Sequence, residues 1–216
     1  MPTQAPGAAR DVLFHAIVYR GYCVVALAED DAALVARARE MEAAFFALDP
    51  SEKKACALKG LMGYYGDPDA DQSFQFRDDT DPDSPWPSPR ALPGFKDTMM
   101  RYYQLMDALC RTVTQTVWAG LGLPPGVARA LGDPPAGELA AGDFGSSVVK
   151  LFRYKSSKAG PRGAGEVRSD LMATHVDRSV VSAIPPNTAS PARQTAYFTY
   201  INTATEIIVK RKLYAI

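Results

Sequence analysis

The chain has 216 residues, 47% of them hydrophobic, and its 24 Lys and Arg residues balance its 24 Asp and Glu residues. This length and apolar content are enough to bury a core, and we expect one domain. A net charge of zero gives no long-range field that would attract nucleic acid or an anionic membrane, so we expect neither partner. No apolar run approaches the roughly 18 residues of a membrane span. Small neutral or anionic molecules remain open as substrates.

The three cysteines, Cys23, Cys56 and Cys110, are odd in number and far apart, in apolar or helical surroundings. That pattern predicts reduced thiols in the core and argues against a disulfide framework or a zinc site. The first ten residues lack the apolar segment of a secretory signal, and we expect them to form a loose tail. A cytoplasmic location fits these observations best.

In the first quarter of the chain the pattern predicts a strand and then two helices. Residues 21–27 open on a glycine and are rich in β-formers, which indicates a strand. Asp30 or Asp31 is placed to cap a helix. Its apolar residues, spaced three and four apart, are Leu34, Val35, Ala38, Met41, Phe45 and Leu48. After Pro50, Ser51 would cap a second short helix whose charged residues we expect on a solvated face.

Residues 60–93 have no helical period and are rich in Gly, Pro, Asp and Ser. Within them, residues 63–66 and 73–76 are candidates for short extended segments. The acidic run at 78–83 lacks the spacing of a calcium loop, and we expect a solvated turn there. Long connections of this kind commonly wall a pocket.

The longest helical pattern runs from Phe95 to about Leu121 and predicts the central packing helix. Its continuous apolar face comprises Met99, Tyr102, Tyr103, Met106, Leu109, Val113, Val117 and Leu121. Methionine and aromatic residues at this spacing are far more typical of a core than of a cofactor site. Gly120 and Gly122 end the pattern, and one further helical turn is expected at 127–131.

Residues 146–154 predict the first strong strand of the second half of the chain. Because side chains alternate along a strand, Lys150, Phe152 and Tyr154 would share one face.

Further along, His175 and Asp177 lie two residues apart between two apolar runs. On a strand they would point the same way, and an imidazole and a carboxylate so placed can bind one divalent ion. Such a pair suits the 2-His-1-carboxylate arrangement that holds non-haem Fe(II). Taken alone, the triplet is more typical of a structural histidine that bonds a backbone group.

Several short motifs follow one another in a characteristic order. They are Gly21–Val25, Phe45–Lys53, Gly63–Tyr64, Ser73–Gln75, Trp86–Pro87, Leu92–Tyr103, Gly120–Pro124, Ser147 with Tyr154, and His175–Asp177. Over roughly residues 12 to 191, this series resembles the isopenicillin N synthase-like family of Fe(II)/2-oxoglutarate-dependent dioxygenases.

The resemblance implies an α+β fold, with a helical N-terminal half followed by a partial double-stranded β-helix, or jelly roll. Residues 1–145 would form the helix-rich region, 146–194 the start of the jelly roll, and 195–216 a divergent tail outside the family pattern. It also implies oxidation of a small organic substrate by O₂, with Fe(II) and 2-oxoglutarate as cofactors.

Carried onto this sequence, the resemblance makes His175 and Asp177 metal ligands. Tyr154 would line the 2-oxoglutarate pocket. Lys150, on the same strand face, would belong to that cosubstrate-binding wall. A tyrosine that only satisfies its hydroxyl at the edge of a core is an equal alternative for Tyr154.

The sequence departs from the family in its last quarter. The family has a second histidine ligand some fifty residues after the first, followed by an arginine and a serine, whereas the other histidine here is His15. Four of the six isoleucines lie after Arg193. We therefore hypothesise that the reading frame leaves the family pattern near residues 191–194. The alternative is a genuine divergent tail that adds one or two strands.

The missing ligand predicts weak iron binding and little turnover, so that this member of the family would be impaired. A competing interpretation is a non-catalytic binding or interaction protein that keeps part of the fold. Unpaired strand edges of a partial jelly roll would then be available to a partner chain.

Overall fold

The computed structural model describes residues 6–67, 71–78, 81, 84–132, 145–153 and 181–185, together with the backbone of 195–200. Helices and strands both contribute to the described fold, which confirms the α+β class. His175, Asp177 and Tyr154 lie outside these residues.

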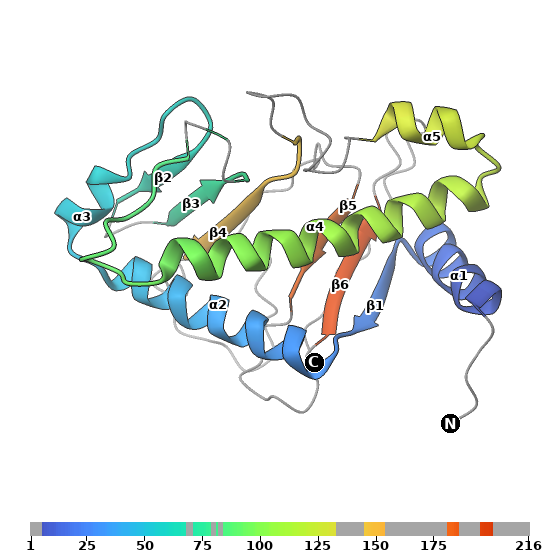
Figure 1. Cartoon of the computed structure of the whole chain (residues 1–216), viewed down its shortest axis with the longest axis horizontal. Coiled ribbons are helices and arrows are strands. Elements are labelled where there is room, and N and C mark those ends of the chain that lie inside the picture. The colour runs from blue at the N-terminus through green and yellow to red at the C-terminus, as the bar shows by residue number, and fades with distance from the viewer. Residues whose placement is uncertain are drawn as a thin grey trace, which may run out of the picture. The chain divides into compact units, whose positions relative to one another are not determined.

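The elements in chain order are α1 (Pro6–His15), η1 (Ala16–Arg20), β1 (Tyr22–Ala26), α2 (Glu29–Ala47), α3 (Pro50–Ala55), β2 (Gly63–Gly66), β3 (Gln72–Phe76), α4 (Phe95–Gly120), α5 (Pro125–Leu131), β4 (Val149–Arg153), β5 (Val181–Ile184) and β6 (Thr195–Tyr200). Figure 1 shows α4 as one uninterrupted helix. The chain divides into two compact units, and α4 changes from one to the other at Ala108. The predicted domain boundaries at residues 145 and 194 stay predictions.

One unit contains α1, η1, β1, the C-terminal part of α4, α5, β5 and β6. Its sheet has the order β1-β6-β5, with both pairs antiparallel, so β6 is the central strand. Buried Ile17, Cys23, Val113 and Val117 form its core. A strand in the C-terminal tail is expected if the tail is genuine and divergent, and β6 lies at Thr195–Tyr200. Whether the tail leaves the family pattern stays a prediction.

The N-terminus differs from the expectation of a loose tail over the first ten residues, since α1 begins at Pro6. Proline suits the start of a helix because its missing N–H has no partner in the first turn anyway. Helix α1 continues into the π-helical turn η1, whose residue Ile17 is buried, and Gly21 ends it with a positive φ of 76°. The buried side chain of Ile17 therefore attaches the N-terminal helical segment to the core, although the composition of the first ten residues does not predict a helix.

The other unit contains α2, α3, β2, β3, β4 and the N-terminal part of α4. Its sheet has the order β2-β3-β4 with antiparallel pairs, and the extended segments predicted near 63–66 and 73–76 are confirmed as β2 and β3. Phe45 of α2 contacts both Phe74 and Phe95, with ring centroids 4.6 Å and 5.3 Å away. All three phenylalanines are essentially inaccessible to solvent, so they form the centre of this core.

Most of the predicted apolar face of α4 is buried, including Met99, Tyr102 and Val117. Leu121 is the exception, because the helix ends at Gly120 and the leucine is 53% exposed. Among the described residues, no helix is long and apolar enough to cross a membrane.

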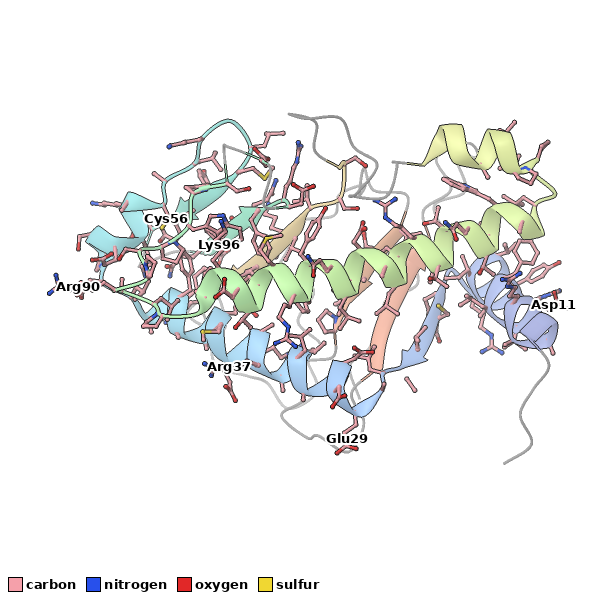
Figure 2. The ribbon with its side chains drawn as sticks, in the orientation of Figure 1. Asp11, Glu29, Arg37, Cys56, Arg90 and Lys96 are labelled. Atoms are coloured by element: carbon pink, nitrogen blue, oxygen red, sulfur yellow. The ribbon has the colours of Figure 1, made fainter. Side chains whose placement is uncertain are left out.

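Two expectations of solvated charge are wrong. Lys53, expected on a solvated face of α3, is only 3% exposed. Asp78 and Asp81, expected in a solvated turn, are also buried. Hydrogen bonds account for the burial of Lys53 and Asp78: Lys53 donates to two oxygens, and Asp78 accepts a bond from the N–H of Gly145 at 3.4 Å. Figure 2 shows Glu29, Arg37 and Arg90 pointing outward from the ribbon, as sequence patterning expects of charged residues.

Gly63 carries the first prediction, because a side chain at this position has neither room nor a relaxed backbone. Its φ is +118°, and a Cβ there would lie 2.8 Å from the carbonyl oxygen of Cys56 and 2.8 Å from Cγ of Pro85. We expect Gly63→Ala to lower the free energy of unfolding by about 2 kcal/mol or more, measured by chemical denaturation. Gly126→Ala in α5, where nothing lies within 4 Å, is the control and should not destabilise. Equal effects of the two substitutions would contradict the prediction.

The buried thiols give a second prediction, on alkaline stability. Burial raises the pKa of Cys23 from 9.0 to about 11, and burial with the nearby Glu52 carboxylate does the same for the pKa of Cys56. The folded chain therefore keeps these protons at a pH where the unfolded chain releases them, so this contribution to stability is lost as pH rises from 9 towards 11.

Lys53 changes stability with pH in the opposite direction. Its pKa is lower in the folded chain than in the unfolded chain, so the unfolded chain holds this proton more tightly and stability rises as the proton is lost. A double variant isolates the thiols. Thermal melts of Cys23→Ala/Cys56→Ala should show a shallower fall of the midpoint with pH over this range than the parent does. Parallel curves would show that the thiols do not carry the effect.

Candidate functional site

Of the four predicted site residues, the structure describes Lys150, which is the second residue of β4. The proposed metal ligands His175 and Asp177 and the cosubstrate residue Tyr154 lie outside the described residues. Within the described part of the chain, no group of three His, Cys, Asp or Glu side chains is placed to hold a metal ion. The part of the candidate site that can be built is therefore the strand that carries Lys150.

Strand β4 pairs with β3 and is the last strand of this sheet among the described residues, and its register defines two faces of the sheet. Leu151 lies opposite Phe74 on the face that packs into the aromatic core. Lys150 lies opposite Gln75, and Phe152 opposite Ser73, on the other face. Lys150 thus belongs to the face that does not pack into the aromatic core.

The Lys150 face combines aromatic rings with polar groups. The ammonium of Lys150 lies 4.7 Å from the ring centroid of Phe152, a cation–π contact between neighbours on one strand face. Phe152 is 41% exposed, and Tyr65, opposite Ser73 in β2, is 69% exposed. A lysine ammonium donates well to a carboxylate, so the chemistry of Lys150 fits the proposed role toward 2-oxoglutarate.

Glu42 of α2 reaches the same strand. Burial raises the pKa of its carboxyl group, while a hydrogen bond with the backbone of Phe152 and the nearby Arg39 lower it. Because an ionised carboxylate only accepts hydrogen bonds, a backbone contact that favours this ionised form comes from an N–H. Glu42 therefore attaches α2 to the strand beside Lys150.

A polar cluster joins Arg153 of β4 to α2, α3, β2 and β3, and its members Lys53, Tyr64 and Gln72 are buried. The ammonium of Lys53 donates to the carbonyl oxygen of Phe46 at 2.9 Å and to Oε1 of Gln72 at 3.0 Å. Arg153 donates through Nη1 to the same carbonyl at 3.0 Å. The hydroxyl of Tyr64 donates to Gln72 Oε1 at 2.9 Å. Two cations, Lys53 and Arg153, thus share the carbonyl oxygen of Phe46, and Lys53 shares Oε1 of Gln72 with the hydroxyl of Tyr64.

The electrostatics of this cluster follow from burial and like charge. Desolvation, reinforced by the positive charge of Arg153, lowers the pKa of Lys53. Burial and the Asp67 carboxylate raise the pKa of Tyr64, against a smaller opposite effect of Arg153. Both shifts favour the neutral form, as expected when charge is withdrawn from water.

Sequence reasoning missed Glu42, Lys53, Gln72 and Arg153 as members of a joined network. Glu42 and Lys53 lie in helical stretches where acidic and basic residues usually face solvent, and no periodicity marks them as buried. A weak signal existed in Gln72, which alternates in phase with Phe74 and Phe76 and so falls on the same face of β3 as these buried rings.

Glu42 gives a third prediction. Because burial raises the pKa of Glu42, the carboxyl's contribution to stability is present at low pH and is lost as pH rises through the folded-state pKa. Glu42→Gln keeps an acceptor for the Phe152 backbone without the buried charge. We expect it to be at least as stable as the parent at neutral pH, and Glu42→Ala to lose about 1 kcal/mol in urea denaturation. A Gln variant as unstable as the Ala variant would show that the charge itself is required.

No protein-family model and no curated protein matches the chain. Solved structures of one protein from Neurospora crassa do match. Its full-length form in complex with alpha-KG and 5-formyluracil aligns with a TM-score of 0.64 and 19% identity over 89% of this chain and 65% of that chain. The full-length complex with alpha-KG gives 0.61 and 20% identity, covering 89% and 67%. The C-terminal truncated apo form gives 0.62 and 18%, covering 89% and 74%.

These matches show that the chain shares the fold of the Neurospora crassa protein. The chain spans slightly less than two thirds of the full-length protein in the complex with 5-formyluracil.

Proposed function

We propose that the chain belongs to the Fe(II)/2-oxoglutarate-dependent oxygenases, within the isopenicillin N synthase-like group, and holds part of their jelly roll. The observation that carries the proposal is the fold match over 89% of the chain to a protein crystallised with alpha-KG. The ordered sequence motifs support it independently. When bound, Fe(II) and 2-oxoglutarate supply the oxidation of substrate by O₂, with decarboxylation of 2-oxoglutarate to succinate.

The chain's own residues have separate roles in this proposal. His175 and Asp177 hold the metal. Lys150 and Tyr154 bind the cosubstrate, Lys150 by donating hydrogen bonds from its ammonium to a carboxylate. The substrate is a small organic molecule, a class to which the 5-formyluracil bound by the Neurospora crassa protein also belongs.

Activity of these 216 residues by themselves would be low. Besides His175 the sequence contains His15, which lies at the end of α1 and bonds the carbonyl oxygen of Asp11 through Nδ1 at 2.8 Å. One imidazole and one carboxylate leave the 2-His-1-carboxylate set incomplete, so iron affinity falls. The competing proposal, a non-catalytic interaction protein, is favoured by this same deficiency and by exposed apolar residues between α3 and β3, Leu58, Leu61 and Tyr65.

Metal titration tests the proposal. Anaerobic calorimetry with Fe(II) should give binding weaker than micromolar, and His175→Ala and Asp177→Ala should each weaken it further by about tenfold or more. His15→Ala is the matched control, because it removes the other imidazole and should leave binding unchanged. Succinate formation from 2-oxoglutarate should be slow and dependent on iron.

The outcomes separate the alternatives. Micromolar iron binding with substrate-coupled turnover would refute the impairment and support the oxygenase assignment. Iron binding that is insensitive to His175→Ala and Asp177→Ala would refute the ligand assignment. Complete absence of iron-dependent succinate formation would favour the interaction protein.

A further inference from the structure

Residues in and next to strand β4 form hydrogen bonds with helices α2 and α4. Near its start, the hydroxyl of Ser147 donates to Oδ1 of Asp107 in α4 at 2.6 Å. Further along, Glu42 of α2 bonds the backbone of Phe152, and Arg153 donates to the carbonyl of Phe46. Among the described strands β4 pairs with β3, and the helices α2 and α4 supply further contacts near both ends of its described residues.

The carbonyl oxygen of Phe46 accepts more hydrogen bonds from cations than the end of a helix needs. The Phe46 carbonyl is one of the last four of α2, which have no partner within the helix, and a single cation is enough to cap such a group. It accepts from both Lys53 and Arg153, although the two positive charges repel each other and Lys53 is almost completely buried.

The second acceptor of Lys53 is Gln72, a residue of β3 that pairs with Arg153 in the sheet. Moving the end of β4 along β3 by one residue would turn Arg153 to the other face and separate it from Phe46. The network therefore fixes the register of β4 on β3.

We propose that Lys53 and Arg153 are positioning residues that fix β4 in register on β3, so that Lys150 of that strand is placed to bind 2-oxoglutarate. This inference rests on the proposed function, because it takes Lys150 as a cosubstrate-binding residue. In this proposal neither cation contacts the cosubstrate itself. They act through the strand.

The test compares Arg153→Ala, Arg153→Lys and Lys53→Met with Arg37→Ala. Arg37 is the control because it is an exposed arginine of α2, the helix that the cations contact, and it is paired with Glu40. The first readout is hydrogen exchange of the β4 amides, Val149–Arg153. The second is the dissociation constant for 2-oxoglutarate, measured by calorimetry in excess Mn(II), which binds without turnover.

We expect Arg153→Ala to speed exchange in β4 by about tenfold and to weaken 2-oxoglutarate binding by about tenfold, the loss of one charge-assisted hydrogen bond. Exchange at the N-terminal part of α4 should stay as in the parent, which separates local release from global destabilisation. Arg153→Lys should recover most of both effects, and Arg37→Ala should show neither. If Lys53→Met folds, it should show the same two effects as Arg153→Ala. If it does not fold, the comparison of Arg153→Ala with Arg153→Lys tests the inference by itself.

Cosubstrate affinity that is equal in Arg153→Ala and the parent would overturn the inference and leave the proposed function standing. A uniform rise in exchange across the unit, without recovery in Arg153→Lys, would also overturn it, because it would show general stabilisation only. A parent chain that does not bind 2-oxoglutarate at all would refute the proposed function, and the inference with it.

Discussion

The end of helix α2 is the point on which one of the two units depends. Two consecutive residues there have opposite tasks: the ring of Phe45 packs among buried aromatic rings, and the carbonyl of Phe46 accepts hydrogen bonds from two cations. Because both residues are fixed by one turn of helix, the apolar core and the polar cluster cannot move independently. The sheet β2-β3-β4 is consequently tied to α2 by packing on its centre and by charge at its margin.

This arrangement explains why the strand with Lys150 has two distinct faces. Leu151 and Phe74 are held against the aromatic core, so the alternating positions Lys150 and Phe152 must face the other way. Glu42 adds a contact at the backbone of Phe152. The side chain of Lys150 thus extends from a strand whose backbone is restrained on both sides, which is the condition for a precise binding residue.

Elements with strong periodicity could be predicted from the sequence. Helix α4 begins at Phe95 as expected, and β1, β2 and β3 lie where β-forming runs follow glycine or polar residues. The order in the sheets could not be predicted, since the pairing of β1 with β6 joins distant parts of the chain that carry no shared signal. Nor could the burial of Lys53, because helical charge patterns do not reveal that a carbonyl and a glutamine oxygen converge on one ammonium. Of the candidate site, the sequence pattern predicts the strand that carries Lys150, and it gives no sign of the contact between Glu42 and the backbone of Phe152.

The central position of β6 also has a consequence for the order of folding. Strand β1 pairs Tyr22 with Thr199, so the strand made first in its sheet has a partner that is synthesised much later. At about 5–20 residues per second, β1 waits many seconds on the ribosome for that partner, whereas β2 and β3 can pair as soon as a short loop is complete. During that interval Val24, which is 47% exposed even in the folded chain, and the unpaired edge beside it are open to contact with other chains. Yield on expression should therefore depend on how fast β5 and β6 arrive.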